Sequence, residues 1–170
     1  PHSHFVNQAI DLAEQSVGRG GGPFGALVVR RGEIIGSASN RVTLDLDPTA
    51  HAEILAIRDA CRRLADHRLS GALLYASCMP CPMCYAAICW ARIDRVYYAA
   101  TAEQAAAVGF DDLEVARELS LRPDLRHPPC HAAKHLVQRH SIRAALGVFD
   151  RRNKGIHILD IGVILLSDIG

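Results

Sequence analysis

The sequence lacks a marked excess of charge of either sign. Its 19 lysines and arginines are matched by 18 acidic residues, so the net charge is +1. The basic residues occur as scattered pairs such as Arg30-Arg31 and Arg62-Arg63, and only 5% of the residues are aromatic. Nucleic-acid-binding domains usually gather basic residues on one face and interleave aromatic side chains among them. The composition therefore argues against nucleic acid as a partner.

Long apolar runs are also missing. The most apolar stretch, Ile156 to Leu166, is interrupted by His157, Asp160 and Gly162 and is too short to cross a bilayer. The first five residues lack the basic start and the apolar run of a signal peptide. We therefore expect a soluble, cytoplasmic protein with no membrane partner.

Helical and strand periodicities alternate along the chain and predict a single α/β domain, residues 1–150, followed by a C-terminal tail, residues 151–170. Strand, helix and strand follow one another between residues 72 and 99, which implies a parallel pair of strands joined by a right-handed crossover. We interpret the glycine-rich residues 18–23 as a connector, because they lack the lysine and hydroxyl residue of a phosphate-binding loop. The predicted helices cover 4–17, 50–64 (capped by Asp47 or Thr49), 83–92, 101–107, 112–119 and 132–146, and the predicted strands cover 26–30, 33–38, 72–77 and 96–99.

The residues that carry chemistry are two cysteines at the start of a predicted helix and a histidine thirty residues earlier. Cys81 and Cys84 share one face of that helix, and the helix dipole favours their thiolate forms, which are the forms that bind zinc. With His51 they would provide three ligands and leave a fourth position open for water, as in a catalytic zinc site. Glu53, close to His51 in sequence, would remain free to move protons.

Two other interpretations of the Cys-x-x-Cys pair remain open, a structural zinc site and a redox pair. A zinc ribbon needs a second such pair, and the sequence contains none after Cys84. The conjunction of His-x-Glu with Pro-Cys-x-x-Cys is the pattern typical of zinc-dependent nucleobase deaminases. We interpret Cys78, which precedes this motif, as a small buried residue.

Two segments, Thr49-Ala-His-Ala-Glu-Ile54 and Pro80-Cys-Pro-Met-Cys84, resemble the cytidine-deaminase-like superfamily of zinc deaminases. Within it, Trp90 and Gly109-Phe-Asp-Asp112 make the chain most similar to the small bacterial guanine deaminases. The resemblance, which extends over residues 5–120, implies a three-layer α/β/α fold: a mixed five-stranded sheet with helices on both faces. It also implies one Zn²⁺ per chain and a homodimer.

The resemblance further implies hydrolytic deamination of a free purine base, guanine to xanthine plus ammonia. Alternative substrates for the same chemistry are an aminotriazine, cytosine or adenosine in tRNA. An alternative outside the enzymes is a zinc-stabilised binding module.

By resemblance, Glu53 and Asp112 would be catalytic. Asn40 would hydrogen-bond a carbonyl of the base. The remaining substrate contacts implied are Phe24 and Trp90, as walls of the pocket, and Ala52.

The sequence departs from the guanine deaminase pattern at two places. Met79 stands where many relatives have glutamate. The chain after residue 121 also differs: guanine deaminases usually end in a short helix and an aromatic terminus that reaches the partner subunit's site, whereas this chain ends in Ser167-Asp-Ile-Gly170. The resemblance therefore leaves open the structure of residues 121–170 and whether the C-terminus is swapped between subunits.

Overall fold

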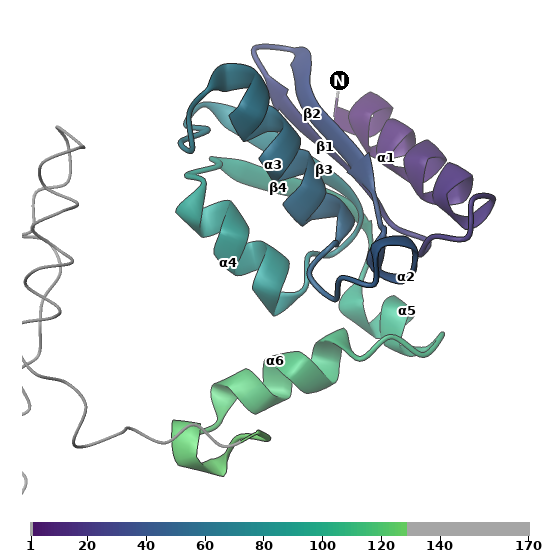
Figure 1. The fold of residues 1–170 in the computed structure, drawn as a ribbon, viewed down its shortest axis with the longest axis vertical. Coiled ribbons are helices and arrows are strands. Elements are labelled where there is room, and N and C mark those ends of the chain that lie inside the picture. The colour runs from purple at the N-terminus through teal and green to yellow at the C-terminus, as the bar shows by residue number, and fades with distance from the viewer. Residues whose placement is uncertain (1, 129–170) are drawn as a thin grey trace, which may run out of the picture. The chain divides into compact units, whose positions relative to one another are not determined.

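A computed structural model of the chain describes residues 2–128 (Figure 1). The chain divides after His127, and the first unit contains every element described here. The predicted helix at 132–146, the domain end at residue 150 and the tail at 151–170 lie outside the described residues. The elements in chain order are α1 His2–Val17, β1 Gly25–Arg30, β2 Glu33–Ser39, α2 Val42–Asp45, α3 Ala52–Leu64, β3 Ala72–Cys78, α4 Pro82–Trp90, β4 Arg95–Ala100, α5 Ala102–Ala106, α6 Asp112–Ser120 and a 3₁₀ turn Pro123–Leu125.

The four strands form one mixed sheet in the order β2-β1-β3-β4. β1 pairs antiparallel with β2 and with β3, whereas β3 and β4 are parallel and are connected through α4. The predicted hairpin and the predicted parallel pair are therefore confirmed. The hairpin turns at Arg31 and Gly32, which both have positive φ, as a two-residue turn of the type that matches the twist of the strands requires. The fifth strand that the resemblance implies is not among the described residues.

Helices cover both faces of this sheet, as Figure 1 shows. On one face, Ala26 and Val28 of β1 pack with residues of α3 and α4. On the other face, Leu27 and Val29 pack with residues of α1. Alternate residues of a strand point to opposite faces, so a central strand covered on both sides needs an unbroken apolar run. The three-layer arrangement is thus confirmed.

α3 approaches β2 very closely. A Cβ atom at Gly36 would lie only 2.7 Å from the Ala60 nitrogen, so no larger residue fits there without a shift of the helix. This contact holds the middle of α3 close against the sheet, and His51 lies at the N-terminus of the same helix.

The start of α3 differs from the predicted one. The helix begins at Ala52, and its N-cap is His51 rather than Thr49 or Asp47. The reason is local, because the Asp47 carboxylate accepts hydrogen bonds from the backbone N–H and the hydroxyl of Thr49. These bonds stabilise a turn before the helix instead of capping its first amides.

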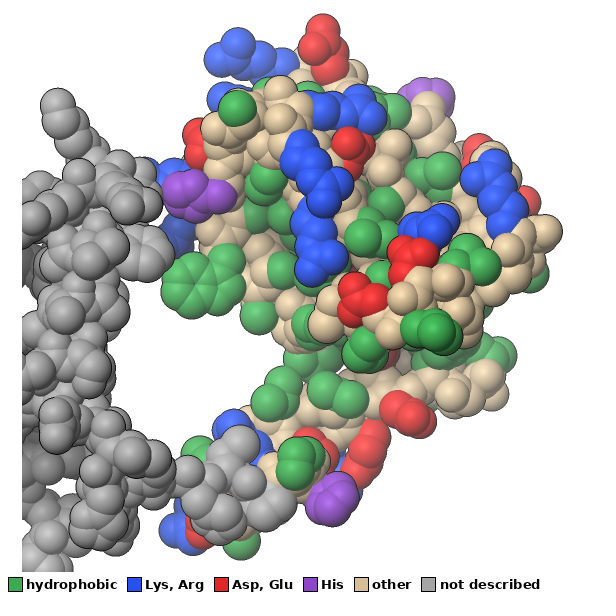
Figure 2. All heavy atoms as spheres, viewed as in Figure 1, with side chains coloured by type: hydrophobic (Ala, Val, Ile, Leu, Met, Phe, Trp, Pro, Cys, Tyr) green, Lys and Arg blue, Asp and Glu red, His purple; other side chains and the backbone are tan. Residues whose placement is uncertain are grey.

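No helix in the described part of the chain is long and apolar enough to span a membrane. The outer surface of α3 is basic, with Arg58, Arg62 and Arg63 exposed, and Figure 2 shows basic side chains over this helix. Arg63 forms a salt bridge with Asp59 on the same helix.

Candidate functional site

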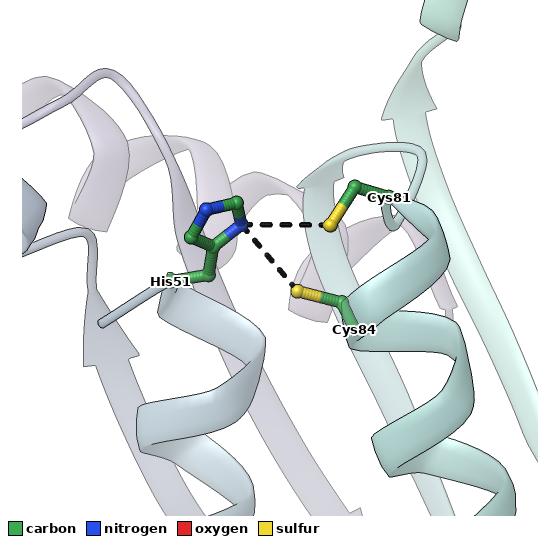
Figure 3. Close-up of side chains that lie close together, drawn as sticks. All are labelled: His51, Cys81 and Cys84. Atoms are coloured by element: carbon green, nitrogen blue, oxygen red, sulfur yellow. Dashed lines mark hydrogen bonds between the residues drawn. The ribbon is translucent and has the colours of Figure 1, made fainter. Parts of the chain in front are cut away.

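His51, Cys81 and Cys84 lie together where the N-termini of α3 and α4 meet (Figure 3). His51 is the N-cap of α3, and Cys81 is the N-cap of α4. An N-cap side chain usually accepts a hydrogen bond from the first turn of its helix, but neither of these does. Both side chains instead point toward the space between the two helices.

The spacing of the three ligand atoms fits a tetrahedral zinc ion. The His51 Nδ1 atom lies 3.6 Å from the sulfur of Cys81 and 3.6 Å from that of Cys84. Zn–N and Zn–S bonds of about 2.0 and 2.3 Å at a tetrahedral angle place nitrogen and sulfur about 3.5 Å apart. The donor set, one imidazole and two thiols, is also the one that zinc prefers.

The charges around the cluster favour a thiolate. A hydrogen bond from the Cys84 thiol, together with His51 beside it, lowers the pKa of Cys81 to about 4. The same bond raises the pKa of Cys84, because its proton is held between the two sulfurs. The hydrogen bond with Cys81 also raises the pKa of His51. These interactions favour the thiolate form of Cys81, which is the form in which a cysteine binds a metal.

Glu53 lies in the first turn of α3 with only 8% of its surface exposed. Burial raises the pKa of its carboxyl group. A carboxyl group whose pKa is moved toward neutrality can both accept and return a proton, as general acid–base catalysis requires. Glu53 is not a member of the metal-ligating cluster.

A cavity of about 230 Å³ opens beside the cluster. Phe24 forms one side, and the ring of Phe110 meets it edge to face at 4.7 Å. Asp112, the first residue of α6, also lines the cavity, and burial raises the pKa of its carboxyl group. The complete lining is Gly22, Phe24, Asn40, Val42, Thr43, His51, Glu53, Cys78, Met79, Cys81, Phe110 and Asp112.

Two predicted substrate contacts do not line this cavity. Ala52 is buried in the core between the sheet and α3. Trp90 is the last residue of α4 and is 79% exposed. It follows Cys84 by six residues, which places it about 9 Å further along the helix axis. Neither residue lines the cavity within the described part of the chain, and their roles as substrate contacts stay predictions.

Several lining residues were not among the predicted contacts. Phe110 belongs to the Gly109-Phe-Asp-Asp112 motif, but the sequence alone did not indicate that its ring would meet Phe24. Val42 and Thr43 closely follow Asn40 in the sequence, and this closeness to a predicted contact was the only sign that they would line the cavity. Cys78 is buried as predicted, and it also reaches the cavity.

The family and the proteins that this chain resembles are all deaminases. Residues 1–100 match the family described as the cytidine and deoxycytidylate deaminase zinc-binding region. A guanine deaminase from Bacillus subtilis is 47% identical over 129 residues, which are 75% of this chain and 83% of the relative. A tRNA-specific adenosine deaminase from Aquifex aeolicus is 44% identical over 57% of this chain and 64% of its own length. The crystal structure of guanine deaminase from Bacillus subtilis superposes with a TM-score of 0.82 at 39% identity, covering 92% of this chain and 98% of that one.

Proposed function

Because the chain belongs to the family of zinc-binding cytidine and deoxycytidylate deaminases, we propose that it hydrolyses guanine to xanthine and ammonia. The family and the relatives make the protein a zinc-dependent hydrolytic deaminase. The choice of guanine is supported by the similarity to a guanine deaminase over three quarters of the chain. The observation that carries the chemistry is a buried carboxyl group, Glu53, beside the His51, Cys81 and Cys84 cluster at one cavity.

The metal ligands in this proposal are His51, Cys81 and Cys84, with one zinc per chain. When bound there, zinc would supply an activated water molecule, because three protein ligands leave one position open. The thiolate character of Cys81 and the meeting of the two helix N-termini favour a cation at this point.

Glu53 is the proton carrier of the proposed reaction. Its carboxylate takes a proton from the attacking water and gives it to a ring nitrogen next to C2 of guanine. A C–O bond forms at C2, and Glu53 then takes the second proton from the new C2 hydroxyl group. It passes this proton to the exocyclic amine, the C–N bond breaks, and ammonia leaves. Burial supports this role, because a desolvated carboxyl group has a pKa closer to that of the groups it serves.

Four other lining residues would orient the base. Phe24 and Phe110 offer an aromatic corner in which a purine ring can stack. Asn40 would donate a hydrogen bond to the carbonyl oxygen at C6. Asp112 would contact the amine that leaves, and it would assist Glu53 with the proton.

An ammonia-release assay on the zinc-loaded protein tests the choice of substrate. The panel is guanine, 2-aminopurine, cytosine, an aminotriazine and a tRNA anticodon stem-loop. We expect guanine to react fastest and 2-aminopurine, which lacks the C6 carbonyl, to react more slowly. Replacement of Asn40 by Ala should lower the rate with guanine and leave the rate with 2-aminopurine little changed.

Faster release from the tRNA stem-loop would instead favour the second candidate, an adenosine deaminase acting on tRNA. The 44% identity to a tRNA-specific adenosine deaminase is the observation that supports this candidate. Such activity should fall steeply with added salt, because phosphate contacts release counterions. Deamination of guanine should be nearly insensitive to salt.

We also place the protein in the cytoplasm as a homodimer. Free thiols at Cys81 and Cys84 suit a reducing compartment. The dimer is supported by α4, a helix of almost entirely apolar sequence whose Tyr85 and Trp90 are 59% and 79% exposed. A helix that is apolar on all sides is usually covered on all sides.

A further inference from the structure

Three polar side chains are buried in the described part of the chain. They are Ser16, 2% exposed, Asn40, 6% exposed, and Glu53, 8% exposed. Asn40 and Glu53 line the cavity, whereas Ser16 lies in the last turn of α1 and does not. Burying a hydroxyl group costs free energy unless it forms a hydrogen bond, so the partner of Ser16 indicates what the residue does.

Ser16 is bonded to the segment that carries Asn40. Its hydroxyl donates to the backbone carbonyl oxygen of Asn40 at 3.0 Å, in a buried contact across 24 residues of sequence. Its own carbonyl oxygen accepts the N–H of Gly21 at 2.9 Å. The backbone N–H of Asn40 donates to the carbonyl oxygen of Phe24 at 2.9 Å. The backbone of Asn40 is thus held from both sides, once by the end of α1.

The side chain of Asn40 is held in one orientation. The backbone N–H of Val42 donates to its Oδ1 atom at 3.1 Å. A backbone N–H can only donate, so the amide oxygen must face Val42 and the NH₂ group must point the other way. No hydrogen bond of the NH₂ group is found within the described residues. Because no buried polar side-chain atom there lacks a partner, this group is open to the cavity that Asn40 lines. It is therefore available as a donor to a bound base.

Two glycines pack directly against this arrangement. A Cβ atom at Gly22 would lie 2.8 Å from Oδ1 and 2.9 Å from Cγ of Asn40. A Cβ atom at Gly21 would lie 2.6 Å from the carbonyl oxygen of Asn40 that Ser16 binds. The glycine-rich segment is therefore more than a connector. Any side chain at these two positions would occupy space that Asn40 now fills.

We propose that Ser16 and Gly22 are positioning residues for the deamination. Ser16 fixes the backbone of Asn40 through its hydroxyl, and Gly22 leaves the Asn40 amide the space it needs to aim its NH₂ group at the substrate. Neither residue is assigned a contact with the base, and both act through Asn40. The inference rests on the substrate-binding role of Asn40 in the proposed function.

A double-mutant cycle on the full, zinc-loaded chain tests Ser16. Ser16→Ala should lower kcat/KM for guanine about three- to tenfold, mainly through KM, which corresponds to the worth of one hydrogen bond. Asn40→Ala should lower it further, and adding Ser16→Ala to Asn40→Ala should change it no more. The thermal midpoint responds differently: Ser16 bonds the backbone of residue 40, so Ser16→Ala should lower Tm equally with Asn or Ala at that position.

The outcomes separate the two ideas. Equal losses of kcat/KM from Ser16→Ala with Asn and with Ala at residue 40 would mean a purely structural role and would overturn the inference. If Asn40→Ala lowers kcat/KM for guanine and Ser16→Ala leaves it unchanged, the inference is overturned while the proposed function stands. Normal kinetics of Asn40→Ala would overturn the role of Asn40 and the inference with it.

A matched pair of glycine variants tests the second residue. Gly22→Ala should lower kcat/KM for guanine by at least the factor seen with Ser16→Ala. Gly18→Ala, in the same segment, is the control, because its Cβ atom would meet only the Gln15 carbonyl oxygen at an ordinary 3.7 Å. It should retain the kinetics of the parent protein. Equal kinetics in the two variants would remove Gly22 from the proposal.

Discussion

At the scale of single residues, the site brings together ionisable groups, each of which would cost free energy to bury alone. Glu53 is a buried carboxyl group, and the sulfurs of Cys81 and Cys84 each lie 3.6 Å from the Nδ1 atom of His51. A buried ionisable group persists where a partner or a function compensates its desolvation. A cation bound by His51 and the two cysteines would provide that compensation.

The first residue-scale prediction concerns Glu53. Glu53→Gln keeps the size of the side chain but removes the proton carrier, so kcat for guanine should fall by about 10²–10⁴-fold. Zinc content, measured by mass spectrometry, should stay at one ion per chain. The exposed Glu103→Gln is the control and should leave both values unchanged. Substantial turnover by Glu53→Gln would contradict the assigned role.

The second residue-scale prediction concerns the metal ligands. Cys84→Ala removes one of the three donors, so purified protein should lose most of its zinc and its activity. Cys89→Ala is a matched control, because this cysteine lies on the same helix and is exposed rather than clustered. A full complement of zinc in Cys84→Ala would exclude the proposed site.

At the scale of elements, the metal would join the N-termini of two helices that the chain connects only through β3. His51 caps α3, and Cys81 caps α4. A ligand that binds only the folded state stabilises it, and this stabilisation is lost when the ligand is removed. Zinc therefore links the two helices as well as serving the chemistry.

The element-scale prediction follows from this link. Removal of zinc with a chelator should lower Tm by several degrees, and the amides at the starts of α3 and α4 should exchange hydrogen faster. Exchange in α1, on the opposite face of the sheet, should change least. The measurement is hydrogen exchange with and without chelator. A uniform increase over all three helices would show that zinc acts on the whole domain instead.

Local patterns predicted most of these elements, but contacts between distant elements were not predictable. Pro82 at the first helical position and the adjacent cysteines indicated where α4 starts, because proline is favoured there. The start of α3 was predicted two residues early, since Asp47 and Thr49 bond each other. Nothing near Phe110 in sequence indicates Phe24 as its neighbour. Nothing near Trp90 indicates which side of α4 is exposed.

At the scale of the whole molecule, the exposed aromatic side chains of α4 have a consequence for assembly: within residues 2–128, Tyr85 and Trp90 are 59% and 79% exposed. These two side chains lie on a helix whose other residues are all apolar. A second copy of the chain would remove this apolar surface from water.

The prediction at this scale concerns the oligomeric state in solution, measured by analytical ultracentrifugation. The parent protein should sediment as a dimer, and Trp90→Glu should shift the equilibrium toward the monomer, because it would bury a charge in the interface. Val17→Glu introduces the same charge at an exposed position on α1 and should remain dimeric. A dimer of unchanged affinity in Trp90→Glu would place the interface elsewhere.

Trp90 is the only tryptophan in the chain, and it lies at the exposed end of α4 rather than in the cavity. The protein thus carries a single tryptophan fluorophore, located away from the cavity. In the monomer its emission should be that of an indole in water, and it should not respond directly to a bound base. A shift to shorter wavelength on raising the protein concentration would report association, without any label, in the same cuvette in which turnover is followed.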